Sequence, residues 1–540
     1  MRAEKRAKKA ARKAEKAARR AEELQAAAAL APTRRRRSGR KLAGLGLSTI
    51  ALLGAAGAGV WFYLQQRNDE VDRRPADVTV EAFGDFGTAI VIRNGAASIN
   101  EVAATPAVID RGLATFDGDT ITFTRPLIAG EAAHLSIVDW NIRLRSDPEA
   151  IVPFIAQGAD IKIRNASISS WDGTGIDAEA GDGRAYVHLE DSLLDIDGLT
   201  VNGLGGPERG RYGLAVANGS TGTINNVTVR NGHVGLDLQG NLPLLMIDSV
   251  DVSGSTLAGI RMASVTGVTL SAASTVESVG DGLLIEGSTS DTTVTGVDAG
   301  ANDGHGVSIT GAAGNVVIGD SRMFRNGGRG ISVANTRGVS LTANTVWANN
   351  GGIGFTGANA SAEVRDSAVT GNRGGGIELA SAGSSVTVTG NTLDHNEFGL
   401  RIADGSAAVE LNSITENGVG VLLEDTSPQV SFTLNDIAGN FDTGFQLAEA
   451  DGLDIEANRI VRNTHAAFTV QVASASEPFW DNNEVDGGRF GVERIYKPLR
   501  EDRALADLIP VPAYFFAEEG RAFADLEQQA QQDPTAAGQP

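Results

Sequence analysis

Residues 376–424 read GIELASAGSSVTVTGNTLDHNEFGLRIADGSAAVELNSITENGVGVLLE, and this stretch contains three starts of one repeated block. Each block opens with a glycine, or once with an alanine, and has apolar residues at the first and third positions after it. The block occurs twelve times in succession at spacings of 21 to 24 residues, and all 24 of these positions are apolar although apolar residues make up only 41% of the chain. The starts are Gly213, Gly235, Gly259, Gly282, Gly306, Gly330, Gly352, Gly376, Gly399, Gly420, Gly444 and Ala467.

A period in the low twenties with short alternating strands is typical of a solenoid, in which each coil buries its apolar face against its neighbours. Leucine-rich repeats are an alternative, but they need a Leu/Asn consensus and usually a helical segment. The coils are instead rich in Gly, Asn, Ser, Thr and Val. This composition favours strands joined by tight turns. We therefore expect an all-β fold of stacked strands.

The second half of five of the coils carries a pair of asparagines five residues apart. Asparagine tolerates the left-handed backbone conformation that a sharp turn needs. When such residues stack at the strand spacing of about 4.8 Å, their amides can hydrogen-bond along the stack as a ladder. We expect this structural role for Asn344/Asn349, Asn391/Asn396, Asn412/Asn417, Asn435/Asn440 and Asn458/Asn463.

The repeat resembles the right-handed parallel β-helix, which is the fold of pectate lyases and of the periplasmic mannuronan epimerases. The right-handedness is implied by this resemblance. Two further segments are similar to the epimerases. Residues 154–157 through 170–172 resemble their early coils, and Arg211-Tyr212-Gly213-Leu214 followed by residues 219–222 resembles the coil before their active site.

Charge divides the chain into a basic start and an acidic body. Residues 1–41 hold 16 Lys/Arg and 4 Asp/Glu, whereas the remainder holds 30 basic and 63 acidic residues, a net charge of −33. Residues 42–64 carry no charge and are long enough to cross a bilayer. We predict a basic, cytoplasmic, helical tail over 1–41, an uncleaved transmembrane signal anchor over 42–64 and a linker over 65–80. A cleaved signal peptide with its site near Ala56–Ala58 is the alternative.

The remaining boundaries follow from where the repeat is regular. Residues 81–133 are rich in predicted strands without the period, and we expect them to form an N-terminal β cap. The β-helix should span 134–494, since the repeat stops at Arg494. Residues 495–540 have mixed character and are expected to form a C-terminal cap and a disordered tail.

The middle position of each block should point outward and align with its counterparts on neighbouring coils. This places Asp237 beside Arg261 and Glu378 beside Arg401, which ladder complementarity alone would explain. The first pair is surrounded by other reactive residues. We predict a candidate catalytic cluster of Arg211, Tyr212, His233, Asp237 and Arg261, because an Arg can neutralise a uronate carboxylate while His or Tyr moves a proton.

Scattered arginines could bind the rest of an acidic glycan, and we expect this of Arg322, Arg329 and Arg401. Clustered carboxylates at the separation that a hydrolase needs are not found in the outward column. No cofactor is predicted. Calcium held by Asp281, Glu286 and Asp303 is conceivable from their adjacent coils, although no loop has a calcium-binding spacing.

The epimerase resemblance implies an Asp-Pro-His-Asp signature on an outward strand. In this chain the corresponding coil reads Asp237-Leu238-Gln239-Gly240, so only one Asp of the signature is present. Two functions therefore stay open. One is a uronate lyase or epimerase that uses the cluster, and the other is a non-catalytic β-helix that binds glycan or serves as an assembly scaffold.

The expected partners are a polysaccharide and, through residues 42–64, a membrane. The expected place is the bacterial inner membrane, crossed once, with the N-terminus cytoplasmic and the β-helix periplasmic or extracellular. A nucleic-acid-binding role for the basic tail is a further alternative, but no nucleic-acid partner is expected.

Overall fold

The computed structural model describes residues 74–472 and 483–485, apart from short gaps at 148–149, 180, 182, 209, 312–313, 359–360, 425–429 and 450–452. The predicted tail (1–41), anchor (42–64) and C-terminal segment (495–540) lie outside the described residues. In the part that is described, no helix is both long and apolar enough to cross a membrane.

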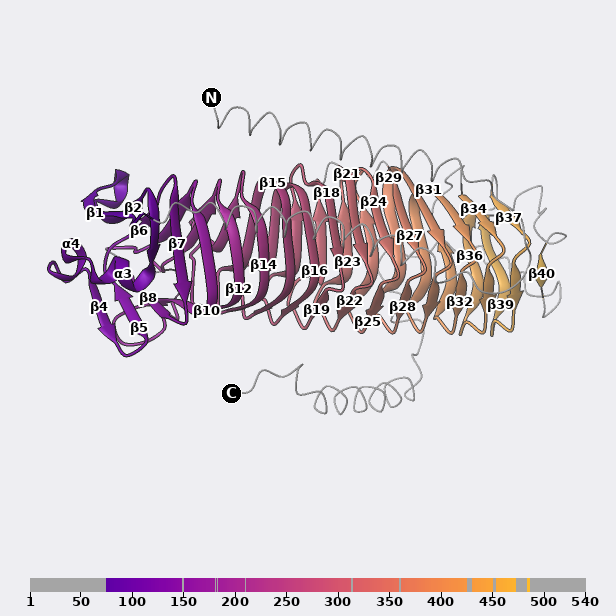
Figure 1. The fold of residues 1–540 in the computed structure, drawn as a ribbon. Coiled ribbons are helices and arrows are strands. Elements are labelled where there is room, and N and C mark those ends of the chain that lie inside the picture. The colour runs from indigo at the N-terminus through magenta and orange to yellow at the C-terminus, as the bar shows by residue number, and fades with distance from the viewer. Residues whose placement is uncertain are drawn as a thin grey trace, which may run out of the picture. The chain divides into compact units, whose positions relative to one another are not determined.

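The described chain coils into a solenoid whose strands stack in parallel along one axis (Figure 1). Every regular coil contributes one strand to each of three stacks, which we call the first, second and third stacks in chain order. Several long strands bend at the corners and take part in more than one stack: β10 (Asp160–Trp171), β12 (Leu193–Asn202), β14 (Thr221–Arg230), β15 (Val234–Ser253), β16 (Ala258–Val276), β29 (Gly375–Thr389) and β31 (Phe398–Glu410).

The first stack begins each coil and contains the Gly-apolar-x-apolar block. It consists of the start of β15, β16, β29 and β31, together with β2 (Thr88–Arg93), β6 (Leu127–Ala129), β9 (Phe154–Gln157), β11 (Val187–Glu190), β13 (Gly213–Ala217), β17 (Asp281–Glu286), β20 (Val307–Thr310), β23 (Arg329–Ala334), β26 (Gly351–Thr356), β33 (Val419–Leu423), β36 (Thr443–Glu449) and β39 (Ala466–Val472).

The second stack follows one corner later. Its separate strands are β3 (Gly95–Ser98), β7 (Ala133–Val138), β18 (Ser290–Thr295), β21 (Gly314–Gly319), β24 (Val339–Thr342), β27 (Ala362–Arg365), β34 (Val430–Thr433) and β37 (Asp454–Glu456). The third stack contains β5 (Thr120–Phe123), β8 (Asn141–Arg145), β19 (Asp298–Gly300), β22 (Arg322–Phe324), β25 (Thr345–Trp347), β28 (Ala368–Thr370), β30 (Thr392–Asp394), β32 (Ser413–Thr415), β35 (Asp436–Ala438), β38 (Arg459–Val461) and β40 (Glu484–Val485).

The N-terminal end is closed by elements that do not repeat. Strand β1 (Asp77–Ala82) pairs antiparallel with β2, and β4 (Ala114–Asp117) forms an antiparallel hairpin with β5. Helix α3 (Ile99–Ala104) buries one apolar face over the end of the core and begins with a capping box between Ser98 and Glu101. A short 3₁₀ turn, η1 (Gly84–Phe86), and helix α4 (Pro106–Ile109) complete this end. These elements, together with first members of the three stacks, lie in residues 77–133, so the first strand begins within the segment predicted as linker (65–80).

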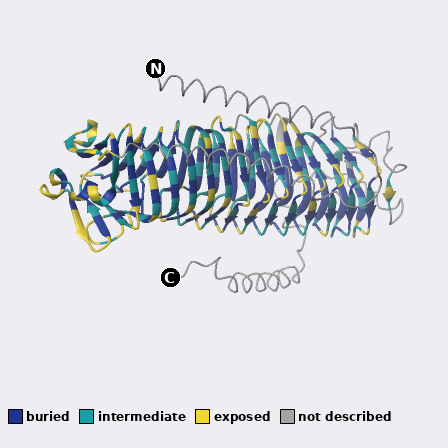
Figure 2. Cartoon of the chain, viewed as in Figure 1, coloured by how far each residue is buried: buried dark blue, intermediate teal, exposed yellow. Residues whose placement is uncertain are grey.

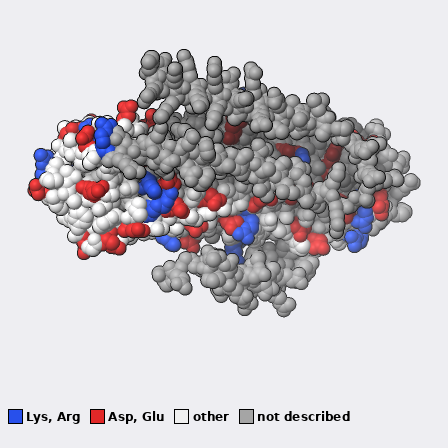
Figure 3. Space-filling model, in the orientation of Figure 1, with Lys and Arg blue, Asp and Glu red and all other residues white. Residues whose placement is uncertain are grey.

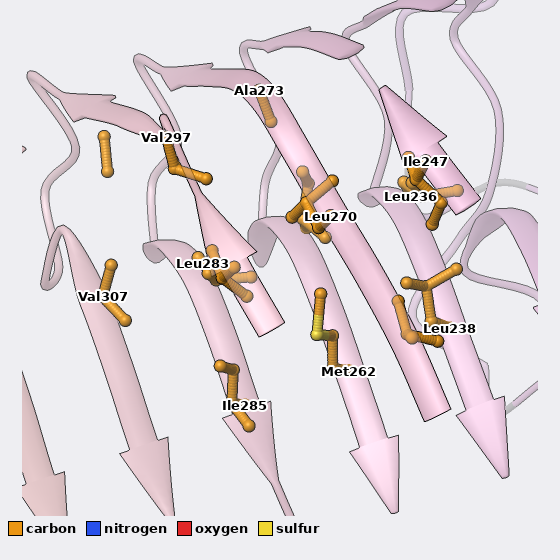
Figure 4. Packing of buried hydrophobic residues seen from close by; sticks show 14 of the residues in the cluster. Leu236, Leu238, Ile247, Met262, Leu270, Ala273, Leu283, Ile285, Val297 and Val307 are labelled. Carbon is orange, nitrogen blue, oxygen red and sulfur yellow. The ribbon is translucent and has the colours of Figure 1, made fainter. Parts of the chain in front are cut away.

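The core is one continuous apolar column enclosed by the three stacks (Figures 2 and 4). All 24 apolar positions of the repeated block are buried. In the close-up of Figure 4, side chains such as Leu236, Leu238 and Met262 point inward from successive coils. Near the C-terminal end the rings of Phe445 and Phe468 stack with centroids 5.1 Å apart. The inward half of the predicted alternation is confirmed.

Two asparagine ladders run along the corners on either side of the third stack, as the sequence predicts. In one of them, each Asn backbone N–H and side-chain amide donates to the Oδ1 of the Asn on the following coil, and the side-chain amide also donates to a backbone carbonyl. This ladder contains Asn302, Asn326, Asn349, Asn372, Asn396, Asn417, Asn440 and Asn463; the other contains Ser321, Asn344, Ser367, Asn391, Asn412, Asn435, Asn458 and Asn483.

One part of that prediction was wrong. The left-handed residue at each corner is not the asparagine but the residue before it, for example Ala343, Leu411 and Leu434 with φ of 56°, 58° and 58°. The asparagine keeps a negative φ because its side chain is needed inside the corner to satisfy backbone groups. The strained position points outward, where side chains of several kinds are found.

Candidate functional site

The candidate site lies on the outward side of the first stack. The outward residue of each block pairs in register with the one on the next coil, from Ala215 through Asp237 and Arg261 to Thr469. The predicted column is therefore confirmed. It continues toward the N-terminus through His188, Ile155 and Ile128, where coil lengths become irregular.

Asp237 and Arg261 form the centre of the site. Arg261 Nη1 donates to Asp237 Oδ1 at 2.9 Å, and Arg261 Nε donates to Glu286 Oε1 at 2.8 Å. The second oxygen of Asp237 accepts from Gln239 Nε2 at 2.5 Å. The side chain of Asp237 is 0% exposed, that of Arg261 16% and that of Glu286 36%. Asp237 thus sits beneath the guanidinium and holds it, while Arg261 and Glu286 reach the surface.

Burial decides the electrostatics of this pair. It raises the pKa of the Asp237 carboxyl above its usual range, even though Gln239 and Arg261 both hydrogen-bond to the charged form. The negative charge of Glu286 acts in the same direction as burial. Arg261 is shared between two carboxylates, so its positive charge is already largely compensated inside the protein.

Tyr212 and His233 complete one side of the site. The Arg261 guanidinium lies over the Tyr212 ring, 5.1 Å from its centroid, and the centroids of Tyr212 and His233 are 5.9 Å apart. Nδ1 of His233 is 2.7 Å from the Thr256 hydroxyl. Burial and the positive charge of Arg184 lower the pKa of His233. The imidazole is therefore neutral at pH 7 and able to accept a proton.

Tyr212 and Arg261 border an open cavity of about 510 Å³, whereas His233 and Asp237 are not among its lining residues. Tyr212 offers it an aromatic face, while amide, guanidinium and carboxylate groups supply donors and acceptors, an arrangement suited to a small polar ligand. The cavity is lined by Tyr212, Asn218, Gln239, Gly240, Arg261, Ala263, Ser264, Glu286 and Gly287.

Arg211 is the one member of the predicted cluster that faces elsewhere. It forms an ion pair with Glu208, three residues before it, and its guanidinium lies 6.0 Å from the centroid of the Tyr186 ring. The insertion between β12 and β13 carries it toward the preceding coil. The structure brings Tyr212, His233, Asp237 and Arg261 together and leaves Arg211 beside them.

The three arginines predicted to bind substrate lie in two places. Arg329 and Arg401 belong to the first stack and converge on Glu378, with Arg329 Nη2 2.8 Å and Arg401 Nη1 3.7 Å from Glu378 Oε2. Arg329 reaches over two coils to do so, which Gly354 allows. A Cβ at Gly354 would lie 2.6 Å from Arg329 Cδ.

Arg322 lies on β22 in the third stack, where its Nε donates to Asp298 Oδ1 at 2.5 Å. It therefore belongs to a different face from Arg329 and Arg401. On the face shown in Figure 3, the described basic side chains lie in small groups beside acidic ones. This agrees with the ion pairs that hold these three arginines.

Sequence reasoning missed Gln239, Glu286 and Asn218 as parts of the site. Gln239 and Glu286 occupy the fourth position after their block starts, which also points outward in a strand. A second outward column read at this position would have found both. Asn218 lies in the turn after β13, where its Oδ1 accepts from the Asn241 backbone N–H at 3.3 Å, and no periodic signal marks it.

Two of the three residues considered for calcium, Glu286 and Asp281, have other partners. Glu286 holds Arg261, and Asp281 Oδ1 accepts the backbone N–H of His305 at 2.7 Å. Within the described ranges, no three His, Cys, Asp or Glu side chains are grouped as metal ligands. The arrangement at this site suits hydrogen bonding, stacking and proton transfer.

Two family models match the chain. The model described as a right handed beta helix region matches residues 234–393, and that described as periplasmic copper-binding protein (NosD) matches residues 382–492. No curated protein is significantly similar to the chain in sequence.

The periplasmic alginate epimerase AlgG is similar in structure, with 12% identity and a TM-score of 0.51, covering 74% of this chain and 95% of the epimerase. A point mutant of that enzyme gives 12% identity, a TM-score of 0.50 and the same coverage. The A-module of a mannuronan C-5 epimerase from Azotobacter vinelandii shares 14% identity with a TM-score of 0.40, covering 62% of this chain and 90% of that module. At these identities the likeness concerns the fold alone.

The copper named in the second family model does not fit the residues found here. Residues 382–492 contain two histidines, no Cys and no Met, whereas protein copper sites are built largely from such ligands. One of the two, His395, lies between Asp394 and Glu416, with each carboxylate 3.0 Å from a ring nitrogen. A single imidazole between two surface carboxylates is an ion-pair arrangement.

The family model, the three stacks of parallel strands and the inward repeat agree with one another. The described part of the chain has the fold of a right-handed parallel β-helix, and this fold is similar to that of the periplasmic alginate epimerase.

Proposed function

We propose that this protein binds polysaccharide outside the cytoplasm, at the cavity bordered by Tyr212 and Arg261. The observation that carries the proposal is the combination of the half-buried Tyr212 ring, which stacks with the Arg261 guanidinium, with several polar groups around an open cavity of about 510 Å³. Sugar rings present apolar C–H faces for stacking and hydroxyls for hydrogen bonds, so this lining suits them. The names of the matched family and of the similar structures support an extracytoplasmic place and a glycan ligand.

The proposed organisation places the β-helix on a membrane anchor. Residues 1–41 would be a basic cytoplasmic tail and residues 42–64 a single transmembrane helix, because positive charge precedes the uncharged segment. The linker 65–80 would then lead into the cap (81–133), the β-helix (134–494) and the C-terminal cap and tail (495–540).

Binding can be tested with the purified full chain and a panel of alginate, pectate, bacterial exopolysaccharides and neutral glucans in isothermal titration calorimetry. We expect one class to bind, and Tyr212→Ala and Arg261→Gln each to weaken it at least tenfold, the loss typical of one stacking or charged contact. Arg322→Gln is the matched control, since it removes an arginine from a different face. Equal loss in the control, or binding that survives both site changes, would refute the site.

A second candidate function, uronate lyase or epimerase, is favoured by the neutral imidazole of His233 next to Tyr212. In both reactions a base removes the proton α to the carboxylate while a cation stabilises the carbanion. His233 or Tyr212 would be the base and Arg261 the cation. The compensation of Arg261 by Asp237 and Glu286 weakens this role, so we rank it below binding.

The two functions differ in their products. A lyase forms an unsaturated uronate with ultraviolet absorbance, and an epimerase inverts C-5, which NMR detects. Either product, lost in His233→Ala and retained in Arg322→Gln, would establish the enzyme. Binding of a glycan without chemical change would establish the scaffold.

A further inference from the structure

A second and larger cavity lies at the N-terminal end of the solenoid, on the outward side of the second stack. Its volume is about 860 Å³. It extends over successive rungs, from residues 75–76 across β3, β7 and β10 to β12. It shares no lining residue with the cavity at Tyr212 and Arg261.

Four polar side chains from the paired strands β7 and β10 lie next to one another in this cavity: His134, Ser136, Asp160 and Lys162. His134 pairs in register with Asp160, and Ser136 pairs with Lys162. Nδ1 of His134 lies 2.8 Å from Asp160 Oδ2. Because Asp160 occupies one ring nitrogen, Nε2 on the opposite side of the ring is free to face a ligand.

The other two of these four side chains, Lys162 and Ser136, are not engaged in this way. Among the described residues, no hydrogen bond or ion pair engages the ammonium of Lys162 or the hydroxyl of Ser136. Asp195 lies beside Lys162 in register but is held by Arg164, whose Nη1 also donates to the Asp195 carbonyl at 2.7 Å. The carboxylate of Asp195 therefore pairs with Arg164 rather than with Lys162.

The remaining acid of the cavity is likewise engaged. Glu101 accepts from the Ser98 backbone N–H at 2.8 Å and from the Ser98 hydroxyl at 2.7 Å. The rest of the wall is formed by small or apolar residues, including Ala76, Val78 and Ala96. The cavity thus combines two unengaged donors, on Lys162 and Ser136, and the unengaged Nε2 of His134 with an apolar surface for the body of a ligand.

We propose that this cavity is a second binding site, specific for an organic oxyanion. Lys162 would supply the charge and Ser136 would donate to the oxyanion, while His134, whose Nδ1–H is directed at Asp160, would accept a hydroxyl of the ligand at Nε2. The shared chemistry is that of a carboxylate or a phosphate carried on a sugar-sized body. The site does not depend on the proposed function at Tyr212 and Arg261.

Calorimetry on the full chain with D-glucuronate, glucose 1-phosphate, glucose and inorganic phosphate tests the proposal and separates the two sources of charge. We expect one sugar oxyanion to bind and neutral glucose not to bind. Lys162→Met should weaken binding at least tenfold and His134→Gln severalfold, whereas Lys162→Arg should keep it within about threefold. Tyr212→Ala should leave it unchanged.

Circular dichroism and thermal unfolding of each variant would show that the fold is intact. The proposal is overturned if no sugar oxyanion binds, if Lys162→Met binds as tightly as the parent, or if inorganic phosphate binds as tightly as the sugar phosphate. Loss of binding in Tyr212→Ala would assign the ligand to the other cavity. Failure here leaves the glycan site at Tyr212 intact, so the two proposals fail separately.

Discussion

Asp237 and Glu378 occupy the same outward position on different coils, and each pairs in register with an arginine on the following coil. Their environments nevertheless differ. Asp237 is fully buried and shares Arg261 with Glu286. Glu378 receives Arg329, the backbone N–H of Gly375 and the charge of Arg401. Burial would raise the pKa of Glu378, but these partners outweigh it and the pKa is lowered. The two carboxyls occupy the same repeat position, but their contributions to the stability of the fold should change with pH in opposite directions.

Asp237→Asn should not destabilise the protein at pH 8, and should stabilise it by up to about 1 kcal/mol. A raised pKa in the folded state means that the carboxyl contributes stability below its unfolded pKa and loses it as pH rises through the folded pKa. The gain from Asn should thus shrink on acidification. Denaturant unfolding of both proteins at several pH values measures it, and a gain that grows as pH falls would contradict the assignment.

Glu378→Gln should behave in the opposite way and cost roughly 1–2 kcal/mol at pH 7. A lowered pKa means that the stability is present above the unfolded pKa and is lost as pH falls through the folded pKa. The difference between the two proteins should therefore vanish in acid. Gly354→Ala offers an independent check, because its Cβ would displace Arg329 from Glu378. The two changes together should cost less than their sum.

At the scale of the strand and corner, the two kinds of element satisfy their backbone hydrogen bonds in different ways. The strands pair with neighbouring coils, and the corners are closed by asparagine side chains that replace the missing backbone partners. Asn391 shows the pattern: its amide donates to the Val364 carbonyl and to Asn412 Oδ1, while its own Oδ1 accepts the Ser367 N–H. Removing one side chain leaves buried groups of two other coils without partners.

Asn391→Ala should cost roughly 2–4 kcal/mol, the penalty for leaving a buried donor and acceptor unpaired. Asn391→Ser is the matched comparison and should cost less than half as much. A serine already occupies this ladder one coil earlier, where the Ser367 hydroxyl oxygen accepts the Asn344 N–H. Chemical denaturation with hydrogen exchange at the adjacent coils compares them, and equal losses would contradict the ladder's role.

Leu411→Asn should stabilise the protein by roughly 0.5–1 kcal/mol. Leu411 has a φ of 58° and is 58% exposed, so it gains little from burial while adopting a conformation that a branched side chain disfavours. Gly390 occupies the same corner one coil earlier with a φ of 70°. Gly390→Ala should therefore destabilise it. Thermal unfolding measures both variants. Opposite shifts in the melting temperature would show that the left-handed backbone conformation, and not surface exposure in general, causes the two effects.

The elements also show how far sequence reasoning reaches. A block with alternating apolar residues fixes which side chains point inward, and it predicted the Asp237–Arg261 and Glu378–Arg401 neighbours. It could not predict Arg329 reaching Glu378, because that contact spans two coils and depends on Gly354. Nor could it place Arg211, because side chains on an insertion follow no period. Asp237 is fully buried at a position that should point outward, and Arg261 and Gln239 engage its two carboxylate oxygens, which no spacing reveals.

Over the whole molecule the dominant property is negative charge. Residues 42–540 carry a net charge of −33, and the described arginines of the first stack are already paired with carboxylates. An anionic glycan is therefore repelled at long range, whatever contacts it makes at short range. Repulsion therefore opposes the encounter of such a glycan with the protein, whereas its docking depends on the short-range contacts.

The association rate of an acidic oligosaccharide should rise with salt, by severalfold between about 10 mM and 150 mM, because screening weakens long-range repulsion. A neutral glycan of the same length should associate at a rate that salt hardly changes. Stopped-flow or surface-plasmon measurements compare them. A rate for the acidic ligand that falls with salt would show that a local positive field governs encounter.

The asparagine ladders have a direction: each coil donates its corner hydrogens to a side chain on the coil that follows it. If the coils form in order from the N-terminal end, the corner N–H groups of the last coil formed would stay unpaired until the next coil is added. A solenoid cut short at any coil would then expose one set of unpaired corner donors at its C-terminal end.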